Sequence, residues 1–279
     1  MPLLHHTYGK GRVRVMRVHR DGDYNEVRDV SVQTMLDGDF AECWTAGDNR
    51  RVVATDTIKN ITYIVAHEQM QAGLELFGQA LGQRFLDRYT HLTAARVTLR
   101  ETAWQRASFN GTPHPHSFTL AGNGIPTATV VVTRGGTATT SGIAGYTFMK
   151  TTGSGWEDYV FDDCTTLAPT ADRIAATAMD ATWTWSTAPP DYAAANAQIL
   201  TTMLEIFATT YSRGVQDSLY RMGEAALAAV PALATITMAC PNKHYIPMNL
   251  DRFGLDANNQ VFIATDEPHG QIECTVGRS

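Results

Sequence analysis

Residues 52–60 read Val52-Val53-Ala54-Thr55-Asp56-Thr57-Ile58-Lys59-Asn60, so that an extended, β-branched pair passes directly into a helical pattern. Thr55 or Asp56 is therefore expected to cap the N-terminus of a helix. The first turn of a helix presents unpaired backbone N–H groups and a partial positive charge, which suit an anionic ligand. Most capped helices bind nothing, so this stretch gains meaning only beside Tyr8-Gly9-Lys10 upstream and Pro241-Asn242-Lys243-His244-Tyr245 near the far end.

The segments around residues 52–60 predict two strands, two helices and further strands. Residues 11–20 and 26–36 read as strands joined by the turn Asp21-Gly22-Asp23. The helical patterns follow at 56–67 and 69–88, and the second has an apolar face formed by Leu74, Phe77, Leu81 and Phe85. Strand-like residues close this half at 92–107 and 116–133, broken by Asn110-Gly111 and Asn123-Gly124.

The second half repeats this order. Its expected strands are 143–150, 174–185, 233–240 and 259–277, and its expected helices are 191–211 and 215–229. Two ββααββ halves, residues 1–137 and 138–279, are therefore predicted. Hairpins joined by helices imply an α+β fold, with antiparallel sheets that carry helices on one face. The uncovered sheet face and edges would be a liability in a monomer, so oligomerisation is expected.

Composition narrows the class of protein. The 279 residues are 44% hydrophobic, enough for a core without disulfides. The net charge of −6, without any basic run, argues against nucleic acid or an acidic membrane surface as a partner. The four cysteines are Cys43, Cys164, Cys240 and Cys274. They lie far apart without a Cys-x-x-Cys motif, and they are expected to be reduced thiols in the core. The N-terminus lacks the pattern of a signal peptide and the C-terminus lacks a peroxisomal tripeptide, so a cytoplasmic location is expected.

Several familiar motifs are missing from the sequence. It has no dinucleotide-binding or Walker-type glycine loop, no zinc spacing and no nucleophile elbow. His114-Pro115-His116 could place two imidazoles on one strand face, but no third ligand can be named, and solvated turn histidines are the simpler interpretation. An enzyme with this sequence is expected to work without metal or cofactor. The long insert 151–172, rich in threonine and aromatic residues, is expected to be a functional loop.

Six groups of residues, in order along nearly the whole chain, resemble the urate oxidase (uricase) family. They are Tyr8-Gly9-Lys10, Val53 to Asn60, Lys150 to Ser154, Thr165-Thr166-Leu167 with Asp172-Arg173-Ile174, Pro241 to Tyr245, and Pro268 to Glu273. The resemblance implies two tandem T-fold halves in a homotetramer that encloses a tunnel, with active sites at subunit interfaces. It also implies cofactor-independent oxidation of urate by dioxygen and water to 5-hydroxyisourate and hydrogen peroxide.

The resemblance also implies which residues bind the substrate. Arg173 matches the arginine that grips one edge of urate, and Gln216 matches the glutamine that pairs with the opposite edge, beside the backbone N–H of Val215. Trp156 stands where the family usually has a phenylalanine that stacks on the purine. Tryptophan also offers a flat face, but its greater width changes the stacking geometry. The simpler alternatives are an Arg173–Asp172 salt bridge and a tryptophan that fills the core.

Lys10, Thr55 and His244 match the family's catalytic relay, in which the lysine is the general base. Asn242 would hold water or dioxygen above the ring, and Asp56 would support the helix start. Lys10 and Thr55 would come from one subunit, and Arg173, Gln216 and Trp156 from its neighbour. The simpler alternatives are a solvated lysine, a helix cap and a structural histidine.

Two other classes remain open from the sequence. One is a zinc-dependent T-fold enzyme acting on a purine or pterin, which would normally anchor the heterocycle with a glutamate. Gln216 and the missing zinc spacing argue against it. The other is a purine-binding tetramer that has lost catalysis, a possibility that Trp156 leaves open.

Overall fold

The computed structural model describes residues 1–255 and 259–278 of the chain. The chain forms two compact units, Met1–Gly142 and Ile143–Ser279. Strand β7 (Gly136–Lys150) runs from the first unit into the second, and the boundary expected at residue 137 lies in the same strand. No helix among the described residues is long and apolar enough to cross a lipid bilayer.

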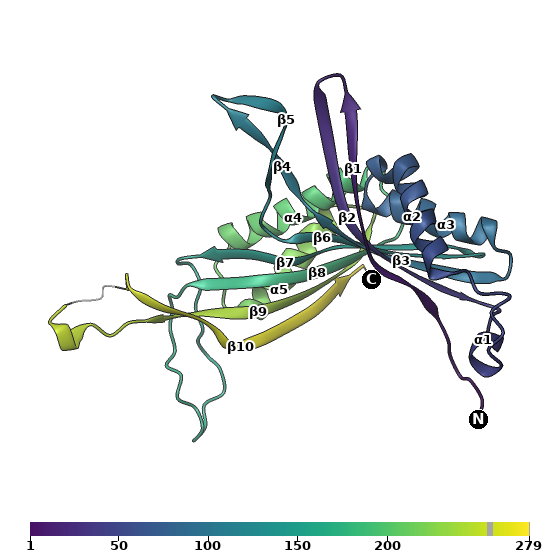
Figure 1. Ribbon diagram of the computed structural model, residues 1–279. Helices are drawn as coiled ribbons and strands as arrows, with labels where there is room; N and C mark the ends of the chain where they lie inside the picture. Colours follow the sequence, from purple (N-terminus) through teal and green to yellow (C-terminus); the bar gives the residue numbers. More distant parts are fainter. Residues whose placement is uncertain (256–258, 279) are drawn as a thin grey trace. The chain divides into compact units, whose positions relative to one another are not determined.

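The first unit is an antiparallel sheet with helices on one face (Figure 1). Its strands lie in the order β1-β2-β3-β6, and β4 and β5 form a separate hairpin. The elements are β1 (Tyr8–Asp21), β2 (Tyr24–Gly38), α1 (Glu42–Thr45), α2 (Thr55–Gln69), the 3₁₀ turn η1 (Met70–Ala72), α3 (Leu74–Arg88), β3 (Leu92–Thr102), β4 (Trp104–Phe109), β5 (Thr112–Leu120) and β6 (Ile125–Thr133).

The core of the first unit lies between helices α2 and α3 and the sheet. The predicted apolar stripe of α3 consists of Leu74, Phe77, Leu81 and Phe85. All four side chains are buried, which confirms the 3.6-residue period of the sequence. Each such side chain contributes about 1.5–3 kcal/mol when fully buried. Gly78 and Gly82 let the helix approach the sheet closely, because a Cβ on them would lie 2.8 Å and 2.6 Å from the Cγ2 atoms of Val130 and Val132.

The second unit repeats the arrangement with strands in the order β7-β8-β9-β10. Its elements are β7, β8 (Ala175–Trp185), α4 (Tyr192–Thr209), α5 (Val215–Ala229), β9 (Leu233–Pro247), the 3₁₀ turn η2 (Asp251–Phe253) and β10 (Phe262–Gly277). Helix α5 packs on β9 and β10, and its bounds agree with the prediction from the sequence. The α+β class with antiparallel sheets is thus confirmed.

Several boundaries differ from the expectations. The helix predicted at 69–88 is interrupted by η1 and by Gly73, whose φ of 110° a residue with a side chain rarely adopts. The segment 92–107 is divided between β3 and β4, and 116–133 between β5 and β6. Strand β7 begins seven residues before 143, at Gly136, and β9 continues past 240 to Pro247. The turn at Asn110-Gly111 is confirmed, because both residues have positive φ, as a two-residue hairpin loop requires.

The cysteines are free thiols, as predicted, but they do not share one environment. Cys240 is buried, and burial raises the pKa of its thiol to about 12. Cys43 and Cys274 are half-buried. The expectation of a core position is wrong for Cys164, which is exposed on the 151–172 insert. That segment lacks the regular apolar period that would place its side chains inside.

Glu101 on β3 makes the stability of the first unit depend on pH. Burial raises the pKa of this carboxyl. The positive charge of Arg28, whose Nη1 lies 3.3 Å from Oε1 of Glu101, opposes the shift. Because the folded-state pKa is raised, Glu101 stabilises the fold below the ordinary glutamate pKa of about 4.3. This stabilisation is lost as the pH rises through the folded-state pKa. We expect Glu101→Gln to raise the denaturation midpoint relative to wild type at pH 7 and to lose this advantage near pH 4.

The measurement is urea denaturation at several pH values and one protein concentration. Exposed Glu205 on α4 provides the control, because Glu205→Gln is expected to leave the pH dependence unchanged. A Glu101→Gln curve parallel to that of the wild type across this range would contradict the assignment.

Candidate active site

A cavity of about 350 Å³ opens in the second unit. Its walls come from the 151–172 insert, the two residues directly before β8, strand β9, and the start of β10 with the chain that enters it. The lining includes Trp156, Leu167, Arg173, Asn242 and His244. Four of these five residues were site candidates from the sequence, so folding brings together side chains almost ninety positions apart.

Arg173 presents a guanidinium with unused hydrogen-bonding capacity. Its backbone N–H donates to the carbonyl of Ser154 at 2.8 Å, which fixes the main chain. Its Nε is buried and has no hydrogen-bond partner among the described residues. Burial lowers the pKa of this guanidinium, and Tyr211 opposes that shift. A buried N–H of this kind normally has a partner, so the position suits a polar ligand.

The alternative salt bridge between Arg173 and Asp172 is not formed. The Asp172 carboxylate instead accepts hydrogen bonds from the Thr152 hydroxyl at 2.8 Å and from the Gly153 N–H at 3.2 Å. Asp172 therefore holds the beginning of the insert, and the guanidinium next to it in sequence stays available.

Trp156 lies beside Arg173 and the start of α5. Its backbone pairs with Thr170 through N–H···O contacts of 2.7 and 3.0 Å, and the Arg173 guanidinium carbon lies 5.7 Å from its ring centre. A Cβ built on Gly214 would lie 2.7 Å from Cζ3 of the indole and 3.2 Å from Oε1 of Gln216. The indole, Gly214 and the Gln216 amide are thus neighbours.

The insert is tied to the segment that leads into α5. The Gly155 N–H donates to the Ser212 carbonyl at 2.8 Å, and the Tyr211 hydroxyl donates to the Ala171 carbonyl at 2.8 Å. Helix α5 starts at Val215 after Gly214, without a side-chain cap. Its first N–H groups, including that of Val215, therefore have no partner within the helix. Val215 and Gln216 adjoin the cavity lining through Gly214 and Trp156 rather than lining it themselves.

Asn242 and His244 lie on β9, two residues apart and so on one face of the strand. Asn242 is paired with Thr177 of β8 and Gly270 of β10, and His244 is opposite Thr265. The β9–β10 register shifts between Thr265 and Gly270, which places an irregularity beside these two side chains. Both are half-buried and line the cavity.

The remaining candidates, Lys10, Thr55 and Asp56, belong to the first unit. Lys10 is half-buried on β1 opposite Thr34, directly before an irregularity in the β1–β2 register. The Tyr8 hydroxyl accepts the Val53 N–H at 2.7 Å and so ties residues 8–10 to the segment before α2. The Asp56 carboxyl has a lowered pKa, chiefly through its hydrogen bond with Lys59, and the charge of Lys10 lowers it further. Lys10 therefore lies near the start of α2.

The prediction that Thr55 or Asp56 caps this helix is wrong. Ala54 occupies the N-cap position of α2, without a side-chain hydrogen bond, and Thr55 is the first helical residue. Asp56 instead bonds within the first turn, to Lys59 and to the Asn60 amide at 3.0 Å. Thr55 is exposed, and its side chain does not cap the helix.

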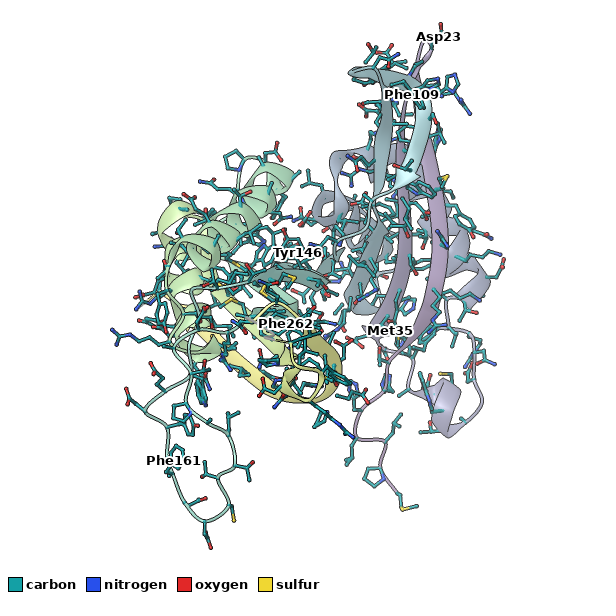
Figure 2. All side chains as sticks on the ribbon, turned by 90° about the vertical axis from the view of Figure 1, so that its left-hand side faces the viewer. Asp23, Met35, Phe109, Tyr146, Phe161 and Phe262 are labelled. Carbon is teal, nitrogen blue, oxygen red and sulfur yellow. The ribbon has the colours of Figure 1, made fainter. Side chains whose placement is uncertain are left out.

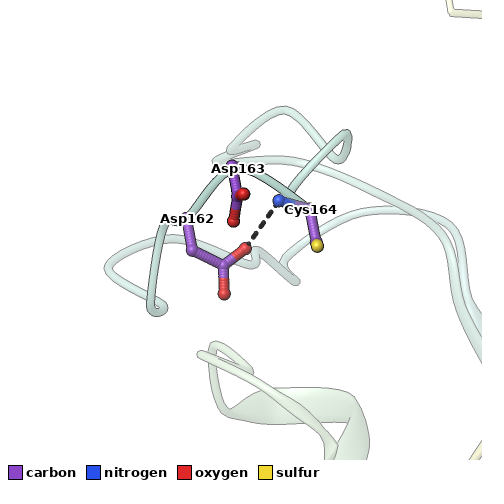
Figure 3. A group of neighbouring side chains, drawn as sticks. All are labelled: Asp162, Asp163 and Cys164. Carbon is purple, nitrogen blue, oxygen red and sulfur yellow. Dashed lines mark hydrogen bonds between the residues drawn. The ribbon is translucent and has the colours of Figure 1, made fainter.

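Among the described residues, the lining of the cavity holds no group of three side chains close enough together to bind one metal ion. His114 and His116 lie on β5 with ring centres 4.6 Å apart. The described part of the chain contains one group of three potential metal ligands that lie close together. It consists of Asp162, Asp163 and Cys164 (Figure 3). All three are exposed on the insert, and the Cys164 N–H bonds to the Asp162 carboxylate at 2.9 Å. None of them lines the cavity.

Two neighbours of the site were not identified as site residues from the sequence. Leu167 lies in the Thr165-Thr166-Leu167 group that carried the resemblance, so its motif was a usable signal. Gly214 directly precedes Val215 and Gln216, but its contact with Trp156 links residues 58 positions apart and left no local signal.

Comparisons with known proteins identify the family of this chain. The sequence profile of the uricase family matches residues 6–131 and 139–273. The uricase of Dictyostelium discoideum is 37% identical over 281 residues, covering 99% of this chain and 98% of that protein. The Arthrobacter globiformis uricase is also 37% identical, covering 99% of this chain and 90% of that protein.

Solved structures give the same result for the fold. The crystal structure of the Arthrobacter globiformis uricase superposes with a TM-score of 0.94, covering 100% of this chain and 95% of that one. This agreement confirms the T-fold expected from the resemblance. Because the family profile and these relatives match nearly the whole chain, the chain belongs to the uricase family, a family of oxidoreductases.

Proposed function

We propose that this protein oxidises urate with dioxygen and water to 5-hydroxyisourate and hydrogen peroxide, without a metal or organic cofactor. Family membership supports the reaction class. The observation that carries the assignment to this site is the unpartnered, buried Nε of Arg173 beside the Trp156 indole. A planar guanidinium next to a flat ring matches a planar ligand whose edge carries carbonyl oxygen and ring nitrogen.

Four groups would bind the substrate. Arg173 would grip one edge of urate, and the amide of Gln216 would donate to and accept from the opposite edge. The uncapped N–H of Val215 would add a donor at the helix start. The indole of Trp156 would stack on the ring, offset rather than face to face.

The chemistry would begin with removal of a proton from bound urate by Lys10 through the hydroxyl of Thr55, and His244 would extend this relay. The electron-rich anion would then give two electrons to dioxygen, which leaves as hydrogen peroxide after taking up two protons. Water, held with dioxygen near Asn242, would supply the hydroxyl that bonds to C5 of the ring. Asp56 would support the first turn of α2 and its N–H groups.

The active protein is proposed to be a cytoplasmic homotetramer that encloses a tunnel. Lys10 and Thr55 would come from one protomer, and Trp156, Arg173 and Gln216 from its neighbour. This division follows the resemblance, and it explains why a dissociated monomer should lack activity.

The test is loss of urate absorbance with equimolar peroxide release, measured on the assembled protein with a strong chelator present. Turnover unaffected by chelation is expected, together with a metal content below one ion per tetramer. Chelator-sensitive turnover would overturn cofactor independence. Tight urate binding without peroxide would instead identify a binding protein that has lost catalysis.

Gly214→Ala is expected to raise the KM for urate by roughly tenfold, because overpacking by one methyl group costs about 1–3 kcal/mol. The added Cβ would press on the indole of Trp156 and on the Gln216 amide, while the extended φ of 174° itself allows alanine. Steady-state kinetics check this, with Gly122→Ala as the control, because the space around Gly122 is open. An unchanged KM for Gly214→Ala would mean that neither side chain contacts the substrate.

A further inference from the structure

Three aromatic rings of the 151–172 insert form a continuous stack. Trp156 and Tyr159 have ring centres 5.7 Å apart and planes 13° from parallel. Tyr159 and Phe161 follow at 5.2 Å and 17°. Trp156, at one end of the stack, lines the cavity. Phe161, at the other end, is 60% exposed and lies on the loop that it labels in Figure 2.

The backbone of the loop is shaped to bring Tyr159 onto Trp156. Asp158 has a φ of 57°, a left-handed conformation that turns the chain back within three residues. The Tyr159 hydroxyl then donates to the carbonyl of Leu167, and the Trp156 backbone pairs with Thr170. Tyr159 is therefore fixed at both ends, by its ring on the indole and by its hydroxyl on the opposite arm of the loop.

This arrangement has a consequence for the ligand. A flat ring packed against a parallel ring on one side offers only its other side for stacking. Leu167, whose carbonyl holds Tyr159, also lines the cavity. Through one side chain, the loop thus couples the orientation of the indole to the position of a second cavity wall.

We propose that Tyr159 is a positioning residue for substrate stacking: its ring holds the indole of Trp156 at the angle at which urate can stack on the free face. The proposal rests on the function proposed above. An unsupported tryptophan in a loop would sample several rotamers, and ordering it on binding would weaken affinity. Tyr159 does not touch the reacting atoms, so its effect falls on substrate binding rather than on the chemical step.

The decisive variants are Tyr159→Ala, which removes the stacked ring, and Tyr159→Phe, which keeps the ring and removes only the hydroxyl. Tyr159→Ala is expected to raise the KM for urate about three- to tenfold, the range that a stacked aromatic pair supports, with kcat changed less than about twofold. Tyr159→Phe should stay within about twofold of wild type in KM. Val160→Ala is the matched control, because the side chain of Val160 is 85% exposed in the same loop.

A spectroscopic measurement on the ligand-free protein separates this proposal from the proposed function. Tyr159→Ala is expected to change the tryptophan emission and its quenching by acrylamide, and the same substitution made in a Trp156→Phe protein should change neither. If the wild type neither binds nor oxidises urate, the proposed function fails, and the emission still decides whether Tyr159 holds the indole. An unchanged KM in Tyr159→Ala, an equal loss in Tyr159→Phe, or unchanged emission would each overturn the proposal.

Discussion

Lys10→Met is expected to lower kcat for urate oxidation by about 10²- to 10⁴-fold, the range that a positioned general base contributes. Methionine keeps the length of the side chain but cannot accept a proton. The surroundings of Lys10 fix its backbone closely, since a Cβ on Gly9 would lie only 1.8 Å from the carbonyl oxygen of Thr34. The KM should change little, because the proposed binding edge is formed by Arg173 and Gln216.

The measurement combines steady-state kinetics with binding of urate under nitrogen, so that affinity is read without turnover. Arg20→Met removes a positive charge from the exposed far end of the same strand, and it should leave kcat within about twofold because surface charges contribute little. If Lys10→Met keeps a tenth or more of the wild-type kcat, lysine is not the general base.

Arg173→Met is expected to lower kcat/KM for urate by roughly 10²-fold, since one hydrogen bond to a charged group contributes about 1.5–3 kcal/mol. The buried Nε has no hydrogen-bond partner among the described residues, so Arg173 contributes most when a ligand supplies an acceptor. Arg173→Lys should recover little of the loss, because an ammonium cannot present two parallel donors to a planar edge.

Arg221→Met on α5 is the control for this experiment. Arg221 forms a surface ion pair with Asp217 at 2.9 Å, four residues earlier on the helix, and such pairs contribute about 0.3–0.5 kcal/mol. Its kinetics should match those of the wild type. If Arg173→Lys and the wild type have equal kcat/KM, only the charge of Arg173 matters, and the bidentate geometry is wrong.

The elements that local pattern predicted well are those whose signal is strong within a few residues. The stripe from Leu74 to Phe85 follows the helical period, and Asn110-Gly111 supplies the positive φ values of a tight turn. Helix α5 begins and ends where its apolar period does. The candidate N-cap failed because Asp56 has competing partners one turn later, in Lys59 and Asn60, and local propensity does not rank such alternatives.

The site shows the same division at longer range. The motifs identified Arg173, Asn242 and His244, and the structure places all three on one cavity. Gly214 against Trp156, and Tyr159 between Trp156 and Leu167, are contacts that no periodicity encodes. The Gly214–Trp156 contact is held by hydrogen bonds between the insert and Ser212, almost sixty positions away. Trp156, Tyr159 and Leu167 all lie within the insert and meet through its own folding.

Local sequence patterns were therefore enough to specify the α+β class and the repeated ββααββ order, whereas the candidate side chains came from the resemblance to the uricase family. The burial of the Arg173 Nε, which has no hydrogen-bond partner among the described residues, and the close approach of Gly214 to Trp156 depend on packing between distant segments. Backbone and side-chain preferences act over a few residues, whereas burial and hydrogen-bond partners depend on which segments meet in three dimensions.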